Sequence, residues 1–139
     1  ALLAGEVWLG QTWNGEAAIA HADNPDIEYV FPEEGCTMWY DNLAIPAGAP
    51  HMDAALLLID YILRPESGML ITYDFPYSNP NLAALELLAT EDPETYEAYM
   101  SFSATNPSAE DMAKLFTIED VGDATEMWDR IWTEVKGGE

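Results

Sequence analysis

Hydrophobic and polar positions follow two different periods along the chain, and the change comes near residue 50. Before it, short stretches rich in β-branched and aromatic side chains predict strands over residues 6–11, 27–31 and 35–46. An alanine-rich stretch over residues 16–22 predicts a helix between the first two strands. A strand, a helix and a strand at this spacing indicate a βαβ unit, and therefore a parallel sheet that helices cover.

Beyond residue 50 the apolar positions recur at helical spacing. The predicted helices cover residues 52–63, 65–73, 80–88, 94–100, 108–116 and 124–137. The side chains that we expect to cap helix N-termini, including that of the helix over 16–22, are Asn14, Asn79, Asp92, Ser108 and Asp123. The helix over 52–63 is apolar over most of its girth, so we expect other elements to cover it.

The last predicted helix carries an apolar stripe that ends at the run Lys136-Gly137-Gly138. The stripe consists of Met127, Trp128, Ile131, Trp132 and Val135. We expect Trp128 and Trp132, together with Trp8 near the start of the chain, to belong to the core.

The composition is that of one globular domain with an extreme charge. The chain has 139 residues, 26 of them acidic and 4 basic, which gives a net charge of −22. Such a surface repels nucleic acid and anionic lipid, and it attracts cations at long range. Acidic residues in every segment are also typical of a salty medium or of simple solubility, so the charge permits a cation site without identifying one. Cys36 is the only cysteine, which excludes an internal disulfide.

The sequence carries no recognisable catalytic motif. His21 and His51 lie near predicted helix ends without a nucleophile in a local motif, and neither a glycine-rich phosphate loop nor zinc-ligand spacing occurs. Acidic pairs such as Glu33-Glu34 would suit glycoside hydrolysis, but among 26 acidic residues close pairs arise by chance. We therefore predict a protein that is not an enzyme, with no catalytic residue, no cofactor and no metal site.

One stretch does carry binding chemistry. On a strand over 35–46, Trp39 and Asp41 share a face and lie roughly 7 Å apart. An indole beside a carboxylate suits an organic cation, because the ring attracts the charge and the carboxylate accepts the N–H donors. The alternative is a buried core tryptophan with Asp41 opening a turn. Trp13 at a strand end and Tyr77 in an aromatic loop would fit the same cleft.

Several motifs resemble the C-terminal part of spermidine/putrescine-binding periplasmic proteins, the substrate-capturing components of ABC importers. The motifs are TWNGEAA (12–18), FPEEG (31–35), WYDNLAIP (39–46), LRPE (63–66), YSNPNLAA (77–84) and DVGDA (120–124). The resemblance implies that two lobes close on a polyamine, with Trp13, Trp39, Asp41 and Tyr77 at ligand-contacting positions. Where the family can place a polar contact just before the last motif, this chain has Ile118 and Glu119.

The resemblance also implies a fold and a setting. It implies an α/β, partial periplasmic-binding-protein type II (two-lobe) fold, with a βαβ start followed by mostly helices. One lobe comprises about residues 1–40 and 79–139, and the other about 41–78. The chain would be a C-terminal fragment of a periplasmic, or tethered extracellular, protein that serves a membrane ABC permease. The opening residues 1–5 fit this expectation, because they look like the last turn of a helix closed by a glycine.

Uncovered strand edges and apolar faces in such a fragment predict that the isolated chain is a homo-oligomer. Three other functions stay open. A related solute-binding protein could hold an anion at the helix N-terminus around Asn14-Gly15. A carbohydrate-active enzyme could use the acidic pairs with tryptophan platforms. A plain acidic interaction module would respond to no small molecule.

Overall fold

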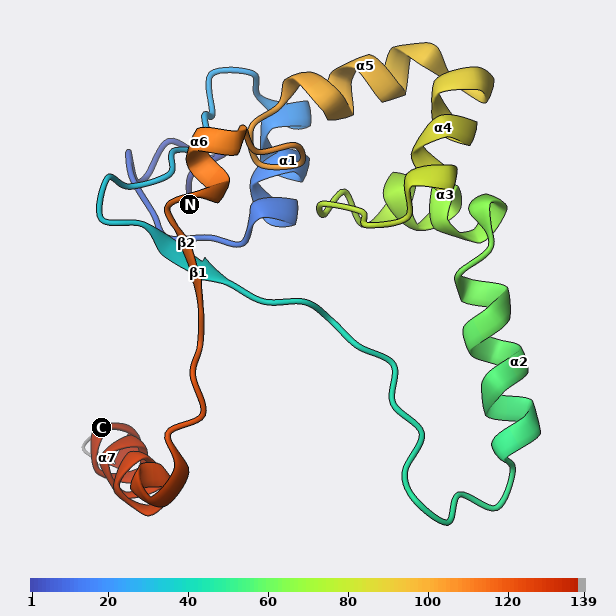
Figure 1. Ribbon diagram of the computed structural model, residues 1–139. Coiled ribbons are helices and arrows are strands. Elements are labelled where there is room, and N and C mark those ends of the chain that lie inside the picture. The colour runs from blue at the N-terminus through green and yellow to red at the C-terminus, as the bar shows by residue number, and fades with distance from the viewer. Residues whose placement is uncertain (138–139) are drawn as a thin grey trace.

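The computed structural model describes residues 1–137 and is built mainly from helices (Figure 1). In chain order the elements are α1 (Asn14–Asp23), β1 (Cys36–Met38), α2 (Met52–Ile62), α3 (Pro65–Asp74), α4 (Leu82–Glu91), α5 (Pro93–Ser101), α6 (Ala109–Met112), β2 (Leu115–Thr117), the 3-10 turn η1 (Gly122–Ala124) and α7 (Thr125–Gly137). None of the helices in this described part is long and apolar enough to cross a membrane.

Helices α3, α4 and α5 pack against one another in sequence order, as the upper right of Figure 1 shows. Ala84 and Leu88 of α4 are fully buried there. Gly68 permits the close approach of α3 to α4, because a Cβ atom at that position would lie 2.7 Å from the Cβ of Ala84. The Asn81 side chain caps α4 by accepting from the N–H of Ala84 at 3.2 Å.

A second packed cluster joins α1 to the turn that follows α5. It consists of Ala17, Phe102 and Ala104, with Ala18 and Tyr29 against it. The His21 ring stacks on Phe102 with 4.3 Å between ring centroids, and its Nδ1 lies 2.7 Å from the carbonyl oxygen of Ile27. His21 therefore has a packing role. We call α1, α3, α4, α5 and the turn at residues 102–106 the packed body.

The only sheet within residues 1–137 is a parallel pair. β1 runs beside β2 with Cys36 opposite Leu115 and Met38 opposite Thr117. The prediction of strands over 6–11 and 27–31 is wrong, and so is the βαβ unit expected at the start of the chain. The strand predicted over 35–46 is confined to Cys36–Met38. The helix predicted over 108–116 ends at Met112, since the residues after it form β2. A strand needs a partner for its backbone, and the described chain supplies one only where β1 meets β2.

Helices α2 and α7 extend away from the packed body (Figure 1). The expected covering of α2 is wrong, because its leucines lie largely exposed, and the expected burial of Trp8, Trp128 and Trp132 is wrong as well. Both predictions assumed a partner surface that residues 1–137 do not provide. Amphipathic spacing specifies a helix, but burial of its apolar face needs a second element in reach.

Some of the predicted helix N-caps are confirmed and others are wrong. Asp92 and Ser108 cap α5 and α6 by accepting backbone N–H groups at 3.1 Å. Asn79 does not cap α4, because Asn81 takes that role two residues later. Asp123 lies within η1 rather than at the start of α7, and Gly138 lies outside the described residues. His51, as expected of a residue at a helix start, immediately precedes α2.

The start of α1 differs from the prediction, whereas the turn at the opening residues agrees with it. The residue before α1 is Trp13, and Asn14 donates instead to the carbonyl of Ala104 at 2.9 Å, so the expected Asn14 cap is wrong. Gly5 has a φ of +70°, and its N–H bonds to the carbonyl of Leu2 while that of Glu6 bonds to Ala1. This is the glycine closure of a helical turn that the sequence predicts.

Candidate ligand-binding site

A large, open cavity of about 2130 Å³ lies beside α1, β1 and the loop before α4. All four residues that the sequence singles out line it: Trp13, Trp39, Asp41 and Tyr77. They come from three separate segments of the chain, and the fold therefore gathers them around one hollow. Ile118 and Glu119, the positions where the chain departs from the resemblance, do not belong to its lining.

The two indoles contact each other. Trp13 directly precedes α1 and Trp39 directly follows β1, and their ring centroids lie 4.5 Å apart with the planes at 88°. This edge-to-face geometry is the favoured arrangement of an aromatic pair and contributes about 0.5–1.5 kcal/mol beyond burial. Both rings remain about half exposed, so part of each stays available to a ligand in the cavity.

Asp41 lines the cavity, but it does so from outside the strand in which the sequence places it. β1 ends at Met38, so Trp39 and Asp41 lie beyond the strand, and the argument from a shared strand face is wrong. Asp41 is exposed, and within residues 1–137 no hydrogen bond or ion pair engages its carboxylate. The carboxylate is thus free to accept donors from a ligand.

Tyr77 packs its ring on the first turn of α1. Gly15 is buried there, and a Cβ atom at that position would lie 2.3 Å from Cε2 of Tyr77. Only glycine leaves room for the ring. The backbone of the Tyr77 loop is held in turn by the hydroxyl of Tyr99, whose burial raises its pKa above the ordinary value of 10.0. The sequence does not predict these contacts of Gly15 and Tyr99, because each contact joins residues far apart along the chain.

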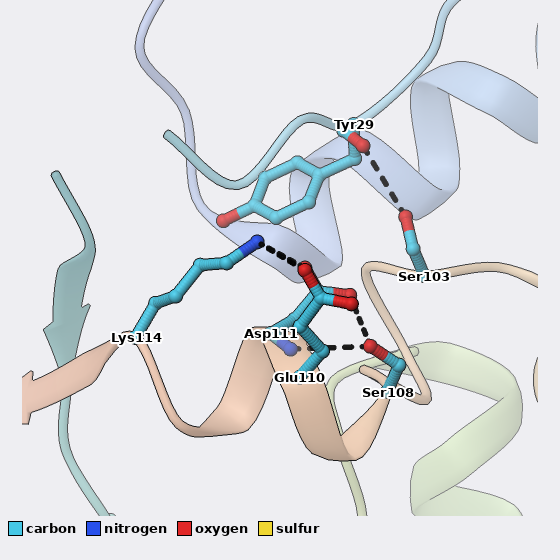
Figure 2. Close-up of polar contacts among 6 residues, drawn as sticks. All are labelled: Tyr29, Ser103, Ser108, Glu110, Asp111 and Lys114. Carbon is cyan, nitrogen blue, oxygen red and sulfur yellow. Dashed lines mark hydrogen bonds and ion pairs between the residues drawn. The ribbon is translucent and has the colours of Figure 1, made fainter. Parts of the chain in front are cut away.

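A polar cluster near β1 engages Lys114, one of the four basic side chains of the chain. Figure 2 shows Lys114 extended toward Asp111, with Nζ 3.4 Å from Oδ1, and Nζ also lies 3.7 Å from a carboxylate oxygen of Glu110. Ser108 donates to the other oxygen of Asp111 at 2.6 Å, and this hydroxyl is the main cause that holds the pKa of Asp111 below 3.8. Burial raises the pKa of the Cys36 thiol, with a further contribution from Asp111.

Each arginine pairs with an acidic side chain four residues away. Arg64 pairs with Asp60 at 3.0 Å and Arg130 with Glu134 at 3.7 Å. Lys136 lies over the ring of Trp132, with Nζ 5.0 Å from its centroid. Across the described part of the chain, no group of three or more histidine, cysteine or acidic side chains is placed to hold a metal ion.

Comparisons with known proteins place the chain among binding proteins. The family model of the bacterial extracellular solute-binding proteins matches residues 1–104. The chain is 37% identical over 136 residues to the spermidine/putrescine-binding periplasmic protein of Salmonella typhimurium, which covers 98% of this chain and 37% of the relative. It is 34% identical over 139 residues to the spermidine/putrescine-binding periplasmic protein 1 of Haemophilus influenzae, which covers 98% and 36%.

A more distant relative is the putrescine/agmatine-binding protein of Pseudomonas aeruginosa, 33% identical over 141 residues, with 96% of this chain and 36% of the relative covered. The chain thus spans little more than a third of the length of the curated relatives it matches. No solved structure matches it.

Proposed function

Since the chain belongs to the family of bacterial extracellular solute-binding proteins, we propose that it supplies part of a polyamine site in the capture component of an ABC importer. The site faces the periplasm or the exterior, and the loaded protein delivers its ligand to a membrane permease. The relatives named above carry the names of spermidine, putrescine and agmatine, which are flexible organic cations.

The observation that carries this proposal is the contact of Trp13 with Trp39 on a cavity that Asp41 also lines. A polyamine has ammonium groups separated by apolar methylenes. The indole faces attract the positive charge and cover the methylenes, and the carboxylate accepts the N–H donors. The net charge of −22 adds a long-range attraction for the same ligand.

The position of Tyr77 argues against an anionic ligand. The N-terminus of α1 would be the natural place for an anion, because its backbone N–H groups are free there. The ring of Tyr77 lies on Gly15 in that first turn and covers it. A cation between aromatic rings therefore fits the cavity better than a carboxylate or a phosphate at the helix end.

The division into lobes remains part of the proposal. Residues 1–40 and 79–139 form one lobe and residues 41–78 the other. The packing of α3 on α4 then joins the two lobes, close to the loop that carries Tyr77. We further propose that the isolated chain self-associates through the exposed apolar faces of α2 and α7, and a monomeric mass at micromolar concentration in sedimentation would contradict this.

A tryptophan-fluorescence titration with putrescine and spermidine, at low and at high salt, tests the function. We expect saturable binding that survives high salt, and Asp41→Asn should weaken it roughly ten-fold or more, because a charge-assisted hydrogen bond is worth roughly 1.5–3 kcal/mol. Asp129→Asn on α7 is the matched control and should leave the affinity unchanged.

Lysine and sodium chloride serve as ligand controls in the same titration. A response that high salt abolishes would indicate counterion attraction to the acidic surface alone, and it would overturn the proposal. Equal losses in the two aspartate variants would remove Asp41 from the site.

A further inference from the structure

Tyr99 of α5 bridges the two ends of the short turn that presents Tyr77. Its side chain is buried, with 6% exposed. The hydroxyl donates to the carbonyl of Tyr77 at 3.0 Å and accepts from the backbone N–H of Asn79 at 2.7 Å. One oxygen atom therefore fixes both the residue that carries the ring and the residue two positions later.

The turn is fastened from its other side by the Asn79 side chain. Its amide nitrogen donates to the hydroxyl of Thr72 at 2.8 Å and to the carbonyl of Gly68 at 3.1 Å. Its amide oxygen accepts from the N–H of Asn81 at 2.9 Å. These bonds tie the turn to α3 and to the start of α4, so Tyr99 is the contact that connects it to α5.

Further hydrogen bonds link the end of α5 to the residue beside Trp13. The hydroxyl of Thr105 donates to the carbonyl of Tyr99, and the neighbouring carbonyl of Ala104 accepts from the side chain of Asn14 at 2.9 Å. Asn14 is the residue after Trp13. The Tyr77 loop and the residue beside Trp13 are thus held against the same end of α5.

We propose that Tyr99 is a positioning residue for ligand capture: it holds the Tyr77 ring against Gly15 of α1, on the cavity that Trp13 also lines. This inference rests on the proposed function. A ring fixed before binding loses less conformational freedom when the ligand arrives, and the affinity rises accordingly. Without the hydroxyl, the turn loses its tie to α5 and the ring leaves its place for part of the time.

The test compares two tyrosine-to-phenylalanine changes. Tyr99→Phe keeps the ring and removes the hydroxyl. Tyr73→Phe is the control, because it also removes a hydrogen-bonding hydroxyl, which donates to Asp92 at 3.1 Å from a partly exposed side chain of α3 away from the Tyr77 turn. We expect the spermidine affinity to fall about 3- to 10-fold in Tyr99→Phe and to stay unchanged in Tyr73→Phe, because the two lost bonds weaken binding only through the fraction of time that the ring is out of place.

A double variant separates positioning from general stabilisation. In a Tyr77→Ala background the ring is gone, so Tyr99→Phe should cost no further affinity. Equal losses with and without the Tyr77 ring would mean that Tyr99 acts on the fold as a whole, and this would overturn the proposal.

Amide hydrogen exchange gives a readout that needs no ligand. The N–H of Asn79 is bonded to the Tyr99 hydroxyl, and its exchange should become faster in Tyr99→Phe, while the amides of the buried α4 segment keep their rates. Unchanged exchange at Asn79 would overturn the positioning role even if polyamine binds. A wild-type chain that ignores polyamine would overturn the proposed function instead, and the exchange rate would still decide whether Tyr99 fixes the turn.

Discussion

Two pairs of tryptophans, one on the cavity and one on α7, have similar exposure and very different surroundings. Trp13 and Trp39 are 54% and 46% exposed, and Trp128 and Trp132 are 61% and 65% exposed. The first two lie in separate segments and meet edge to face beside Asp41. The second two lie one turn apart on α7, and α7 lies away from the packed body (Figure 1). Exposure of the rings therefore does not distinguish the two pairs, whereas convergence of the rings beside an unpaired charge does.

The same contrast holds for leucines. Leu88 in α4 is 0% exposed and Leu57 in α2 is 69% exposed, although both lie in helices of similar length and apolar content. The difference arises because α4 packs against both α3 and α5, whereas the main helix contact of α2 within residues 1–137 is with α3.

The largest expected effect concerns the core. Leu88→Ala should lower the free energy of unfolding by about 2–5 kcal/mol, because it leaves a void in a fully buried position. Below the concentration at which the chain self-associates, Leu57→Ala should change it by less than about 0.5 kcal/mol. Urea denaturation at several protein concentrations measures both. A concentration-dependent cost at Leu57 would mean that a second copy covers α2, and equal costs in dilute solution would contradict the contrast.

A smaller effect is expected from the tryptophans on ligand affinity. Trp39→Ala should weaken spermidine binding roughly 10- to 30-fold, because a cation–π contact of up to about 2 kcal/mol and the partner of Trp13 are both lost. Trp132→Ala on α7 should leave the affinity unchanged. Isothermal titration calorimetry of both variants measures the difference, and comparable losses would remove the cavity from ligand recognition.

The smallest expected effect is a pH dependence of the folding stability that arises at the N-terminus of α5. The pKa of Asp92 is held below 3.8, first by the backbone N–H of Thr95 and then by its hydroxyl. A lowered pKa in the folded state stabilises the protein above pH 3.8, and the contribution disappears as the pH falls through the lowered value. The stability difference between the wild type and Asp92→Asn should therefore shrink over this acidic range.

Thr95→Val, which lacks the hydroxyl donor, should lose that contribution at a higher pH than the wild type. Denaturation followed by circular dichroism at a series of acidic pH values measures the shift. A stability difference that does not change with pH would show that the capping bonds do not depend on the charge of Asp92.

Features decided by neighbours in sequence were predictable. Asp92 and Ser108 cap their helices because a cap involves residues within three positions. Pro65 opens α3 for the same reason, since its ring is compatible with the first turn. The cap expected from Asn79 failed because that side chain bonds to α3 instead, and Asn81 serves two residues later.

Features decided by distant partners were not predictable from the local pattern. Residues 27–31 alternate like a strand, yet within residues 1–137 nothing lies beside them to complete a ladder. β2 was missed because its three residues pair with β1 from the other end of the chain. The four cavity residues were found by chemistry and resemblance, and the argument from the strand face contributed the wrong geometry.

The contact of Tyr77 with Gly15 limits how the two positions can vary together. A methyl group at position 15 would overlap the ring, so any side chain there demands a smaller residue at position 77. Among chains selected for binding from a library randomised at both positions, glycine should accompany every aromatic residue at 77. Survivors with alanine or serine at 15 should carry a shortened side chain opposite. This pair would then appear as coupled substitutions in sequence data alone, without reference to any coordinates.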